Sequence, residues 1–579
     1  MRKLLKYLKG YVKESIIGPL FKMLEASFEL FVPLIMANIV DVGIRTEDTA
    51  YIWRMCAVLV FLGVLGLTCS LTAQYFAAKA SMGFGTALRN DLFAHINSLS
   101  YTELDVIGTS TLVTRITSDI NQVQTGVNLV LRLFLRSPFI VVGAVIMALT
   151  ISVKMTVIFL IAVPLIALTI FLIVKITIPI YKKVQSVLDR VMLLTRENYS
   201  GARVVRAFAR QEDEKKDFQE TSDSLKAIQI FAGRISALMN PITYVFVNLA
   251  IIAILLKGGR EVYNGSITQG EVMALVNYMT QILLALVALA NLIISYTKAT
   301  ASALRINEVM AVKTTMTDDA EDMVKLPDSP YAVEFDHVSF TYAKASAPSL
   351  QDISFRVKKG QTVGIIGSTG SGKSTLVNLI PRFYDASQGE VRVQGVPVRK
   401  YPFAQLRGGI GVVPQKAVLF QGSIRQNMQW RKKEASDDEI LEAVSIAQAG
   451  EIVEKKQEGL DFKIAPGGKN LSGGQRQRLT IARALVGRPD ILILDDSASA
   501  LDFATDAALR RAIREKTKGM TVFLVSQRAA TIKQADQILV LDDGRLAGVG
   551  THRELFHSCG VYREICLSQF SKEEVESLA

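Results

Sequence analysis

The stretch VGIIGSTGSGKST at residues 363–375 joins an apolar strand to a glycine-rich turn that ends in Gly-Lys-Ser-Thr. The spacing G-x-x-x-x-G-K-S predicts a loop whose backbone N–H groups wrap phosphate oxygens, with positive potential from the N-terminus of the helix that follows. Lys373 is placed to reach the outer phosphates, and Ser374 is placed to ligate Mg²⁺. The candidate phosphate-binding residues are Gly367, Ser368, Thr369, Gly370, Ser371, Gly372, Lys373, Ser374 and Thr375.

A second motif supports this interpretation. The sequence ILILDD at 491–496 is a short apolar strand followed by Asp495, which is placed to hold a magnesium ion beside the phosphates. A chance glycine-rich turn would have no reason to occur with such a strand. Short apolar strands alternate with helical stretches after residue 330, a pattern typical of an α/β domain with a partly parallel sheet. We therefore expect an ATP- and Mg²⁺-binding domain here.

The N-terminal half has the composition of a membrane protein. Half of the 579 residues are hydrophobic and the mean hydropathy is +0.29. Four runs without Asp, Glu, Lys or Arg have 20 to 26 residues each, enough to cross about 30 Å of hydrocarbon. These features exclude a wholly soluble enzyme, a disordered chain and a fibrous repeat. We predict six spans, near residues 16–40, 55–78, 137–153, 155–178, 239–259 and 270–297.

Two connections between the spans, about 79–136 and 179–238, are long and carry charged, helical sequence. We expect spans two to five to continue outside the bilayer as helical rods. Residues 1–13 hold five Lys or Arg among apolar residues and suit a short helix in the headgroup plane. This basic segment places the N-terminus in the cytoplasm, and six spans return the second half to the same side. No extended transit segment precedes the first span, which favours a bacterial plasma membrane over an organelle.

The net charge of +12 is not concentrated anywhere. Residues 1–330 have 32 basic against 26 acidic side chains, and residues 331–579 have 34 against 28. Because the positive charge is evenly distributed and forms no basic stripe, the sequence argues against a nucleic-acid motor. The four cysteines have neither metal-ligand spacing nor a disulfide framework, and we interpret them as packing residues.

With LSGGQRQ at 471–477, the chain resembles the ATP-binding cassette (ABC) exporters over essentially its whole length. The resemblance implies a six-helix, all-α transmembrane domain of the type I exporter (type IV transporter) fold at 1–310, a linker at 311–330 and an α/β nucleotide-binding domain at 331–579. It also implies two such domains that sandwich ATP head to tail. The phosphate loop of each chain then faces the LSGGQ motif of the other.

The same resemblance assigns further residues one by one. Tyr342 is similar to the adenine-stacking aromatic, and Gln415 in GVVPQ to the glutamine that ligates Mg²⁺ with Ser374 and Asp495. The signature acting on the other chain's site corresponds to Ser472, Gly473, Gly474 and Gln475, and the loop that joins the two sites to Ser499, Ala500, Leu501 and Asp502. Residues 109–123 and 197–212 resemble the intracellular coupling loops, and we expect residues 199–209, including Gly201 and Phe208, to contact the partner's domain.

Two positions depart from the family pattern. Asp496 replaces the glutamate that activates the attacking water, and aspartate is one methylene shorter. Gln527 replaces the switch histidine and cannot carry charge. A weakened site beside an intact signature indicates two different chains, so we expect a heterodimer in which this chain forms a degenerate, non-hydrolysing ATP site. A slow homodimer is the alternative.

The transported substrate is weakly specified. Glu25 and Glu29 lie four residues apart on one face of the first span, near Lys22. The carboxylates could bind cationic drugs, or they could line a wet entrance or contact lipid headgroups. If these carboxylates bind substrate, replacing both by glutamine should shift selectivity against cations. Three interpretations stay open: an exporter of lipophilic compounds, a lipid floppase or importer on the same scaffold, and an ATP-regulated sensor or pore.

Overall fold

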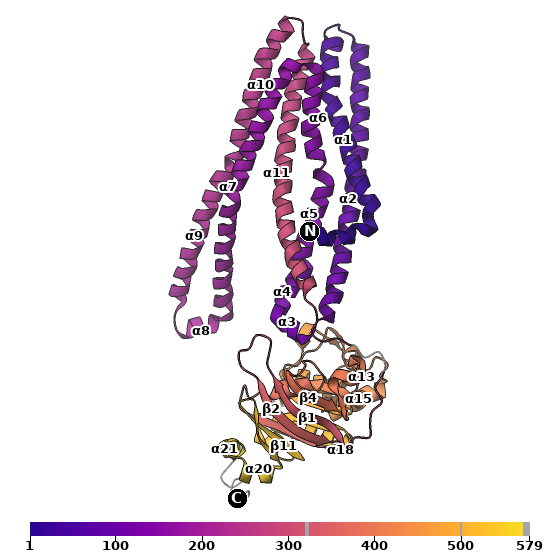
Figure 1. Cartoon of the computed structure of the whole chain (residues 1–579), viewed down its shortest axis with the longest axis vertical. Coiled ribbons are helices and arrows are strands. Elements are labelled where there is room, and N and C mark those ends of the chain that lie inside the picture. The colour runs from indigo at the N-terminus through magenta and orange to yellow at the C-terminus, as the bar shows by residue number, and fades with distance from the viewer. Residues whose placement is uncertain (319–322, 498–500, 571–579) are drawn as a thin grey trace. The chain divides into compact units, whose positions relative to one another are not determined.

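The computed structural model describes residues 1–318, 323–497 and 501–570 of the chain (Figure 1). The chain divides into two compact units. The membrane unit comprises Met1–Asn97 and Ser110–Val312, and the nucleotide unit comprises Ser98–Thr109 and Lys313–Ala579. The short segment Ser98–Thr109 lies in sequence between two long helices, yet it belongs to the nucleotide unit.

The membrane unit is entirely helical. Within the described residues, six helical stretches are long and apolar enough to cross a membrane, which confirms the six predicted spans. Helix α2 has 50 residues and a length of about 75 Å, so it extends far beyond the hydrocarbon region as predicted. The helices are η1 (Arg2–Tyr11), α1 (Val12–Asn38), η2 (Ile39–Ile44), α2 (Thr49–Ser98), α4 (Thr109–Thr114), η3 (Arg115–Asp119), α5 (Ile120–Leu133), α6 (Arg136–Ile151), α7 (Val153–Ser200), α8 (Ala202–Ala207), α9 (Gln211–Ala237), α10 (Met239–Tyr263) and α11 (Gln269–Ala311).

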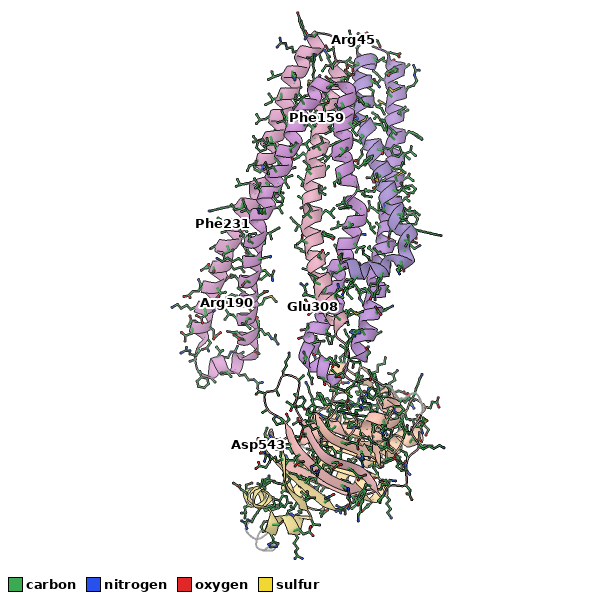
Figure 2. The ribbon with its side chains drawn as sticks, in the orientation of Figure 1. Arg45, Phe159, Arg190, Phe231, Glu308 and Asp543 are labelled. Carbon is green, nitrogen blue, oxygen red and sulfur yellow. The ribbon has the colours of Figure 1, made fainter. Side chains whose placement is uncertain are left out.

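The core of the membrane unit forms around α11, whose apolar side chains pack against α1, α6, α7 and α10. Phe159 on α7 is fully buried in this core (Figure 2). Small residues let the helices approach closely, as at Gly143 of α6, where a Cβ would lie 2.4 Å from the Leu30 side chain. Away from the core, α7 and α9 run side by side as a separate pair (Figure 1).

The charged residues of α1 have internal partners. Lys22 Nζ lies 2.5 Å from Glu25 Oε2 and 3.2 Å from Ser70 Oγ, and Arg136 Nη2 lies 2.8 Å from Glu29 Oε2. Intramembrane charges are costly unless they are paired, so these contacts offset part of that cost. The two carboxylates are thus engaged by cations of the chain itself, which favours a structural role over the cation site considered from sequence.

A proline shapes α1 at the same level. Pro33 has no N–H to donate to the carbonyl of Glu29, four residues earlier. Gln281 Nε2 of α11 donates to this carbonyl at 3.4 Å, and the Tyr278 hydroxyl donates to the Leu30 carbonyl at 2.7 Å. Side chains of α11 therefore supply donors where the backbone of α1 is interrupted.

The nucleotide unit is an α/β domain with two main sheets. An antiparallel sheet has the order β2-β1-β4-β5, and a six-stranded sheet has the order β12-β11-β3-β10-β9-β6, in which β12 pairs antiparallel and the other neighbours pair parallel. Strand β10 lies between β3 and β9, so the carboxyl ends of these three strands meet at one edge. The strands are β1 (Tyr331–Phe340), β2 (Leu350–Lys358), β3 (Thr362–Gly367), β4 (Gln388–Val393), β5 (Val396–Pro397), β6 (Ile410–Val413), β7 (Gly422–Ser423), β8 (Lys463–Ile464), β9 (Ile491–Asp495), β10 (Thr521–Val525), β11 (Gln537–Asp542) and β12 (Arg545–Gly550).

Helices pack against the six-stranded sheet and form a smaller subdomain after β6, and their apolar side chains complete two buried clusters. The helices of the nucleotide unit are α3 (Tyr101–Ile107), α12 (Lys373–Leu379), η4 (Val398–Lys400), α13 (Phe403–Gly408), α14 (Ile424–Met428), α15 (Asp437–Ile446), α16 (Gly450–Glu454), η5 (Gly459–Asp461), η6 (Pro466–Gly468), α17 (Gly473–Leu485), α18 (Phe503–Lys516), α19 (Ala529–Ile532), α20 (His552–Ser558) and α21 (Gly560–Gln569).

Candidate nucleotide-binding site

The predicted phosphate loop connects β3 to α12, as the sequence indicates. Gly370 and Gly372 have φ values of +86° and +95°, a left-handed conformation that glycine adopts without strain. Gly367 is required for a different reason, because a Cβ there would lie 2.1 Å from the Leu541 carbonyl oxygen. The loop ends at the N-terminus of α12, where free N–H groups favour an anion.

Lys373 lies under this loop. Its ammonium group donates to the carbonyls of Gly367 and Ser368 at 2.9 and 2.6 Å, and the side chain is mostly buried. Burial lowers the pKa of Lys373, while the nearby Asp496 and Asp495 raise it. A buried cation with neutral acceptors around it is suited to the negative charge of phosphate.

Oxygen ligands for a metal ion gather beside the loop. The Ser374 hydroxyl donates to Asp495 Oδ1 at 3.0 Å, which brings the predicted magnesium ligands together. Burial raises the pKa of Asp495, and the bond from Ser374 opposes this shift. The Gln415 amide reaches the same edge of the sheet, 3.5 Å from Asp496 Oδ2. Hydroxyl, carboxylate and amide oxygens are the donor set that Mg²⁺ prefers, so these residues fit the ion.

The two divergent positions lie at this edge as well. Asp496 follows β9 with a φ of 44°, and its N–H donates to the Val525 carbonyl of β10 at 3.0 Å. Gln527 follows the end of β10 by two residues and has an exposed side chain. Because β10 lies between the strands that lead to the phosphate loop and to Asp495, Gln527 is beside both.

Tyr342 also lies near the loop. Its hydroxyl is 3.1 Å from Thr375 Oγ1, and its ring makes edge contacts with Phe340 and Tyr384, with centroids 4.8 and 5.3 Å apart. The side chain is half-buried, so part of the ring can face a base.

The signature motif caps a helix elsewhere in the unit. Ser472 is the N-cap of α17: Gln475 N donates to its hydroxyl at 3.3 Å, and its own N–H donates to Gln475 Oε1 at 2.9 Å. Ser472 and Gly473 are exposed, while Gly474 and Gln475 are half-buried. A cap and an exposed glycine present N–H groups outward, as a site completed by another chain requires.

The loop after β9 is described only in part. Asp502 is the N-cap of α18, where its carboxylate accepts from Thr505 N at 2.8 Å, and this bond holds the pKa of Asp502 below its usual range. Leu501 is buried. The predicted residues Ser499 and Ala500 lie outside the described residues.

Sequence reasoning missed the contacts of α3. The Tyr384 hydroxyl donates to Asp105 Oδ2 at 2.6 Å, Lys344 Nζ donates to the Val106 carbonyl at 2.8 Å, and Glu103 accepts from the Thr315 hydroxyl at 2.8 Å. Burial raises the pKa of Tyr384, and Asp105 raises it further. A cavity of about 310 Å³ opens here and is lined by both α3 and Tyr342. The residues in contact are separated by more than 200 positions in the sequence. Hydrophobic periodicity acts within short windows, so it could not predict these contacts.

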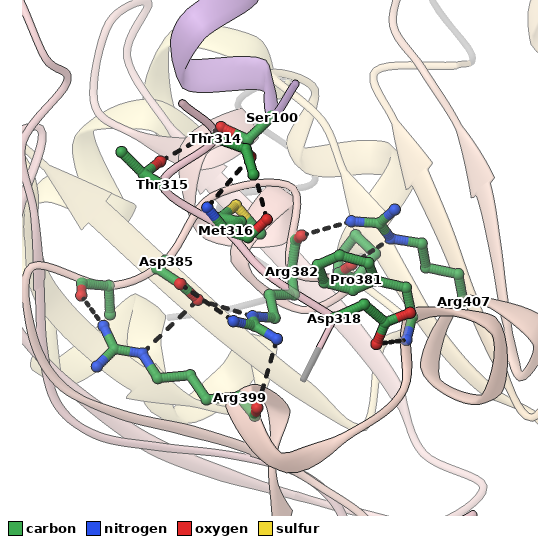
Figure 3. Close-up of polar contacts among 12 residues, drawn as sticks. Ser100, Thr314, Thr315, Met316, Asp318, Pro381, Arg382, Asp385, Arg399 and Arg407 are labelled. Carbon is green, nitrogen blue, oxygen red and sulfur yellow. Dashed lines mark hydrogen bonds and ion pairs between the residues drawn. The ribbon is translucent and has the colours of Figure 1, made fainter. Parts of the chain in front are cut away.

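An arginine network holds the segment that presents Tyr384 (Figure 3). Arg407 donates to the carbonyls of Pro381 and Arg382 at 3.2 and 2.9 Å, and Arg382 pairs with Asp385 at 2.9 Å. The linker contributes at the same place, where Asp318 accepts from the backbone N–H of Phe403 at 3.0 Å. The segment 381–385 is therefore fixed on both sides of the tyrosine.

Comparison with known proteins agrees with this architecture. The ABC transporter transmembrane region family matches residues 15–286, and the ABC transporter family matches residues 350–499. An ABC transporter ATP-binding protein of Bacillus subtilis, YfiB, is 37% identical over 577 residues and is covered completely, as is this chain. An ATP-dependent lipid A-core flippase of Chromobacterium violaceum is 31% identical over 577 residues, 99% of this chain and 98% of the flippase.

Among solved structures, a bacterial Atm1-family ABC exporter with ATP bound has the same fold. Its TM-score is 0.79 at 23% identity, with 97% of this chain and 99% of that chain covered. The six spans and the bacterial relatives identify an inner-membrane, multi-pass protein with a cytoplasmic ATPase domain. The chain belongs to the ABC transporter family, as an exporter half-transporter with one transmembrane region and one nucleotide-binding domain.

Proposed function

We propose that this chain is one subunit of a heterodimeric ATP-driven exporter, in which it forms a degenerate ATP site and supplies the signature to the hydrolysing site of its partner. The observation that carries the proposal is the pairing of Asp496 and Gln527 beside an otherwise complete nucleotide site. Both replacements concern groups that act on the terminal phosphate and the attacking water, whereas the groups that bind nucleotide are retained.

Binding is assigned to the chain's own residues. Tyr342 stacks on the adenine, the N–H groups of the 367–375 loop hold the phosphates, and Lys373 neutralises the outer ones. Ser374, Gln415 and Asp495 would hold Mg²⁺, and the ion would supply positive charge beside the phosphates. These residues suffice to retain ATP for long periods.

Hydrolysis at this site is expected to be slow. A carboxylate that is one methylene shorter displaces the base by about 1 Å, which can lower a rate by roughly 100-fold. Gln527 donates a hydrogen bond at most and brings no positive charge toward the γ-phosphate.

The partner's site needs this chain's signature. Ser472, Gly473, Gly474 and Gln475 form a regular, exposed helix cap, which supports a working role in trans together with Asp502. In a heterodimer, this cap is kept because the partner's hydrolysing site needs it. A homodimer would place the same cap at two sites weakened by Asp496 and Gln527, where there is less reason to keep it. A homodimer remains the second candidate.

The α8 end of the membrane unit is the proposed contact with the partner's nucleotide domain. Tyr199 is 82% exposed and Phe208 is 75% exposed, on either side of the short helix Ala202–Ala207 that follows Gly201. Their exposed apolar surface would be covered by such a contact.

For the substrate, we propose amphipathic compounds of drug or lipid type, moved outward by alternating access. Glu25 pairs with Lys22 and Glu29 with Arg136, which supports a structural role for these carboxylates over a dedicated cation site. A relative described as a lipid A-core flippase supports a lipid-like substrate, so a floppase is the second candidate. The direction of transport in inverted vesicles distinguishes import on this scaffold, whereas ATP-regulated gating would show ATP-dependent conductance without accumulation.

The composition of the native complex tests the proposal. The chain is tagged, purified from its own membranes in mild detergent, and the co-purifying proteins are measured by intact mass. We expect an equimolar second half-transporter that carries the glutamate and histidine missing here. Recovery of copies of this chain alone would overturn the heterodimer and favour a slow homodimeric machine.

A further inference from the structure

The C-terminal helix α21 contacts the loop that carries Gln527 through the side chain of Gln569. Gln569 Nε2 donates to the Gln527 carbonyl at 2.8 Å, and Gln569 Oε1 accepts from the Ala529 N–H at 2.8 Å. One amide thereby binds the backbone on both sides of Arg528. This two-point contact restrains the loop more than either bond alone.

The loop needs such a restraint because it lies between two regular elements. It leaves β10 at Val525 and enters α19 at Ala529, and the first N–H groups of a helix have no partner within the helix. Gln569 satisfies the first of them. Since β10 lies between β3 and β9, a shift of this loop moves Gln527 relative to both the phosphate loop and Asp495.

Gln569 is itself held in place. The neighbouring Phe570 ring packs against His552, with centroids 6.0 Å apart, and lies under the ammonium group of Lys533 at 5.6 Å. His552 Nδ1 is 2.7 Å from the hydroxyl of Tyr562, which is fully buried near the start of α21. Contacts near both ends of α21 therefore fix where its last turn lies.

The loop also touches the element that follows Asp502. The guanidinium of Arg528 lies 5.1 Å from the centre of the Phe503 ring, at the first residue of α18. A displacement at Ala529 would thus affect both Gln527 and the start of α18.

We propose that Gln569 is a positioning residue of the nucleotide site: it fixes the 526–529 loop so that Gln527 recognises the terminal phosphate, and the C-terminal helix thereby sets the preference for ATP over ADP. This inference rests on the proposed role of Gln527. The hydrogen bonds that the described residues give the Gln569 side chain go to Gln527 and Ala529 and not to the 367–375 loop. We therefore expect loss of its amide to weaken binding of ATP and to leave binding of ADP unchanged.

The test compares Gln569→Ala with Ser568→Ala, a variant at a neighbouring exposed residue whose hydroxyl donates to the Ile565 carbonyl within α21 at 2.8 Å. The full transporter is purified in nanodiscs, and 8-azido-ATP labelling of this chain is competed with ATP and with ADP. The inhibition constant of ADP divided by that of ATP measures the preference for ATP. We expect Gln569→Ala to lower this ratio about five-fold, which corresponds to the free energy of one hydrogen bond. Ser568→Ala should leave the ratio unchanged. Hydrogen exchange at Ala529 should accelerate in Gln569→Ala while that of residues 562–566 stays the same.

A double variant separates this inference from the proposed function. If Gln569 acts through Gln527, the variant Gln527→Ala with Gln569→Ala lowers the ratio no further than Gln527→Ala alone. An unchanged ratio in Gln569→Ala together with a reduced one in Gln527→Ala would overturn the positioning role and leave the role of Gln527 intact. Unchanged ratios in both would overturn both. Equal loss of ATP and ADP binding in Gln569→Ala would show a structural effect only, and would also overturn the proposal.

Discussion

Asp496 has a backbone conformation that aspartate tolerates better than most residues. Its φ of 44° lies in the left-handed region, where Asp and Asn are enriched because their short side chains bond locally. Its N–H is fixed by the Val525 carbonyl, so the direction of the side chain is set by the strand pair β9 and β10. The length of the side chain is then the property that decides how near a carboxylate comes to the attacking water.

This argument predicts a gain of function within this chain. Ser472→Arg should abolish turnover of the complex, because it removes the cap that completes the partner's site. Adding Asp496→Glu and Gln527→His to Ser472→Arg should restore hydrolysis at this chain's own site, about 100-fold above the Ser472→Arg background. Phosphate release by the purified complex measures both effects.

The single variant Asp496→Glu serves as the control. It should change ATP turnover of the otherwise unaltered complex by less than about two-fold, which is roughly the error of the assay. The partner's site accounts for most of the turnover, and Gln527 still lacks charge. Full turnover in Ser472→Arg would show that the partner's site does not depend on this chain's signature. The proposed role of the signature in trans would then be wrong.

We expect the short helix α3 to couple events at the nucleotide to the membrane helices. It is continuous in the chain with α2 and α4, yet it belongs to the nucleotide unit through Tyr384 and Lys344. Tyr384 in turn contacts Tyr342, the proposed adenine-stacking residue. We therefore expect a movement of the base-binding edge to reach α3 through these direct contacts.

We expect Tyr384→Phe to weaken this coupling without weakening nucleotide binding. The variant loses the bond to Asp105, and drug- or lipid-stimulated ATP turnover should fall about five-fold while labelling by 8-azido-ATP is retained. Tyr401→Phe is a matched control, because Tyr401 is also buried in the nucleotide unit and its hydroxyl donates to the Val393 carbonyl at 2.9 Å. Equal effects of the two variants would attribute the loss to stability alone.

The same contacts show what sequence could and could not provide. The phosphate loop, the Asp495 strand and the six spans were predictable, because spacing and apolar length act within short windows. Tyr384 with Asp105, and Gln569 with Gln527, are contacts between elements distant in sequence and leave no periodic signal. The charges of α1 were visible, but their partners Ser70 and Arg136 depend on how the helices pack.

At the scale of the whole transporter, the proposed pair of unequal ATP sites would imply unequal motion. A site that keeps ATP also keeps its two nucleotide domains together on that side, whereas a hydrolysing site loses the γ-phosphate and opens. Closure and opening would then amount to a pivot about this chain's own phosphate loop. The membrane helices would alternate their access while one half of the sandwich stays closed.

Distances between spin labels across each site test this asymmetry. One label at the exposed Ala345, near Tyr342, pairs with a label beside the partner's signature, and a second at the exposed Lys469, near Ser472, pairs with one beside the partner's phosphate loop. During turnover the Ala345 pair should keep one short distance, and the Lys469 pair should populate a short and a long one, because only its site is emptied in each cycle. Trapping with a non-hydrolysable ATP analogue should bring both pairs to the short distance. Long distances at both pairs during turnover would mean that ATP is released from both sites, and the pivot would be excluded.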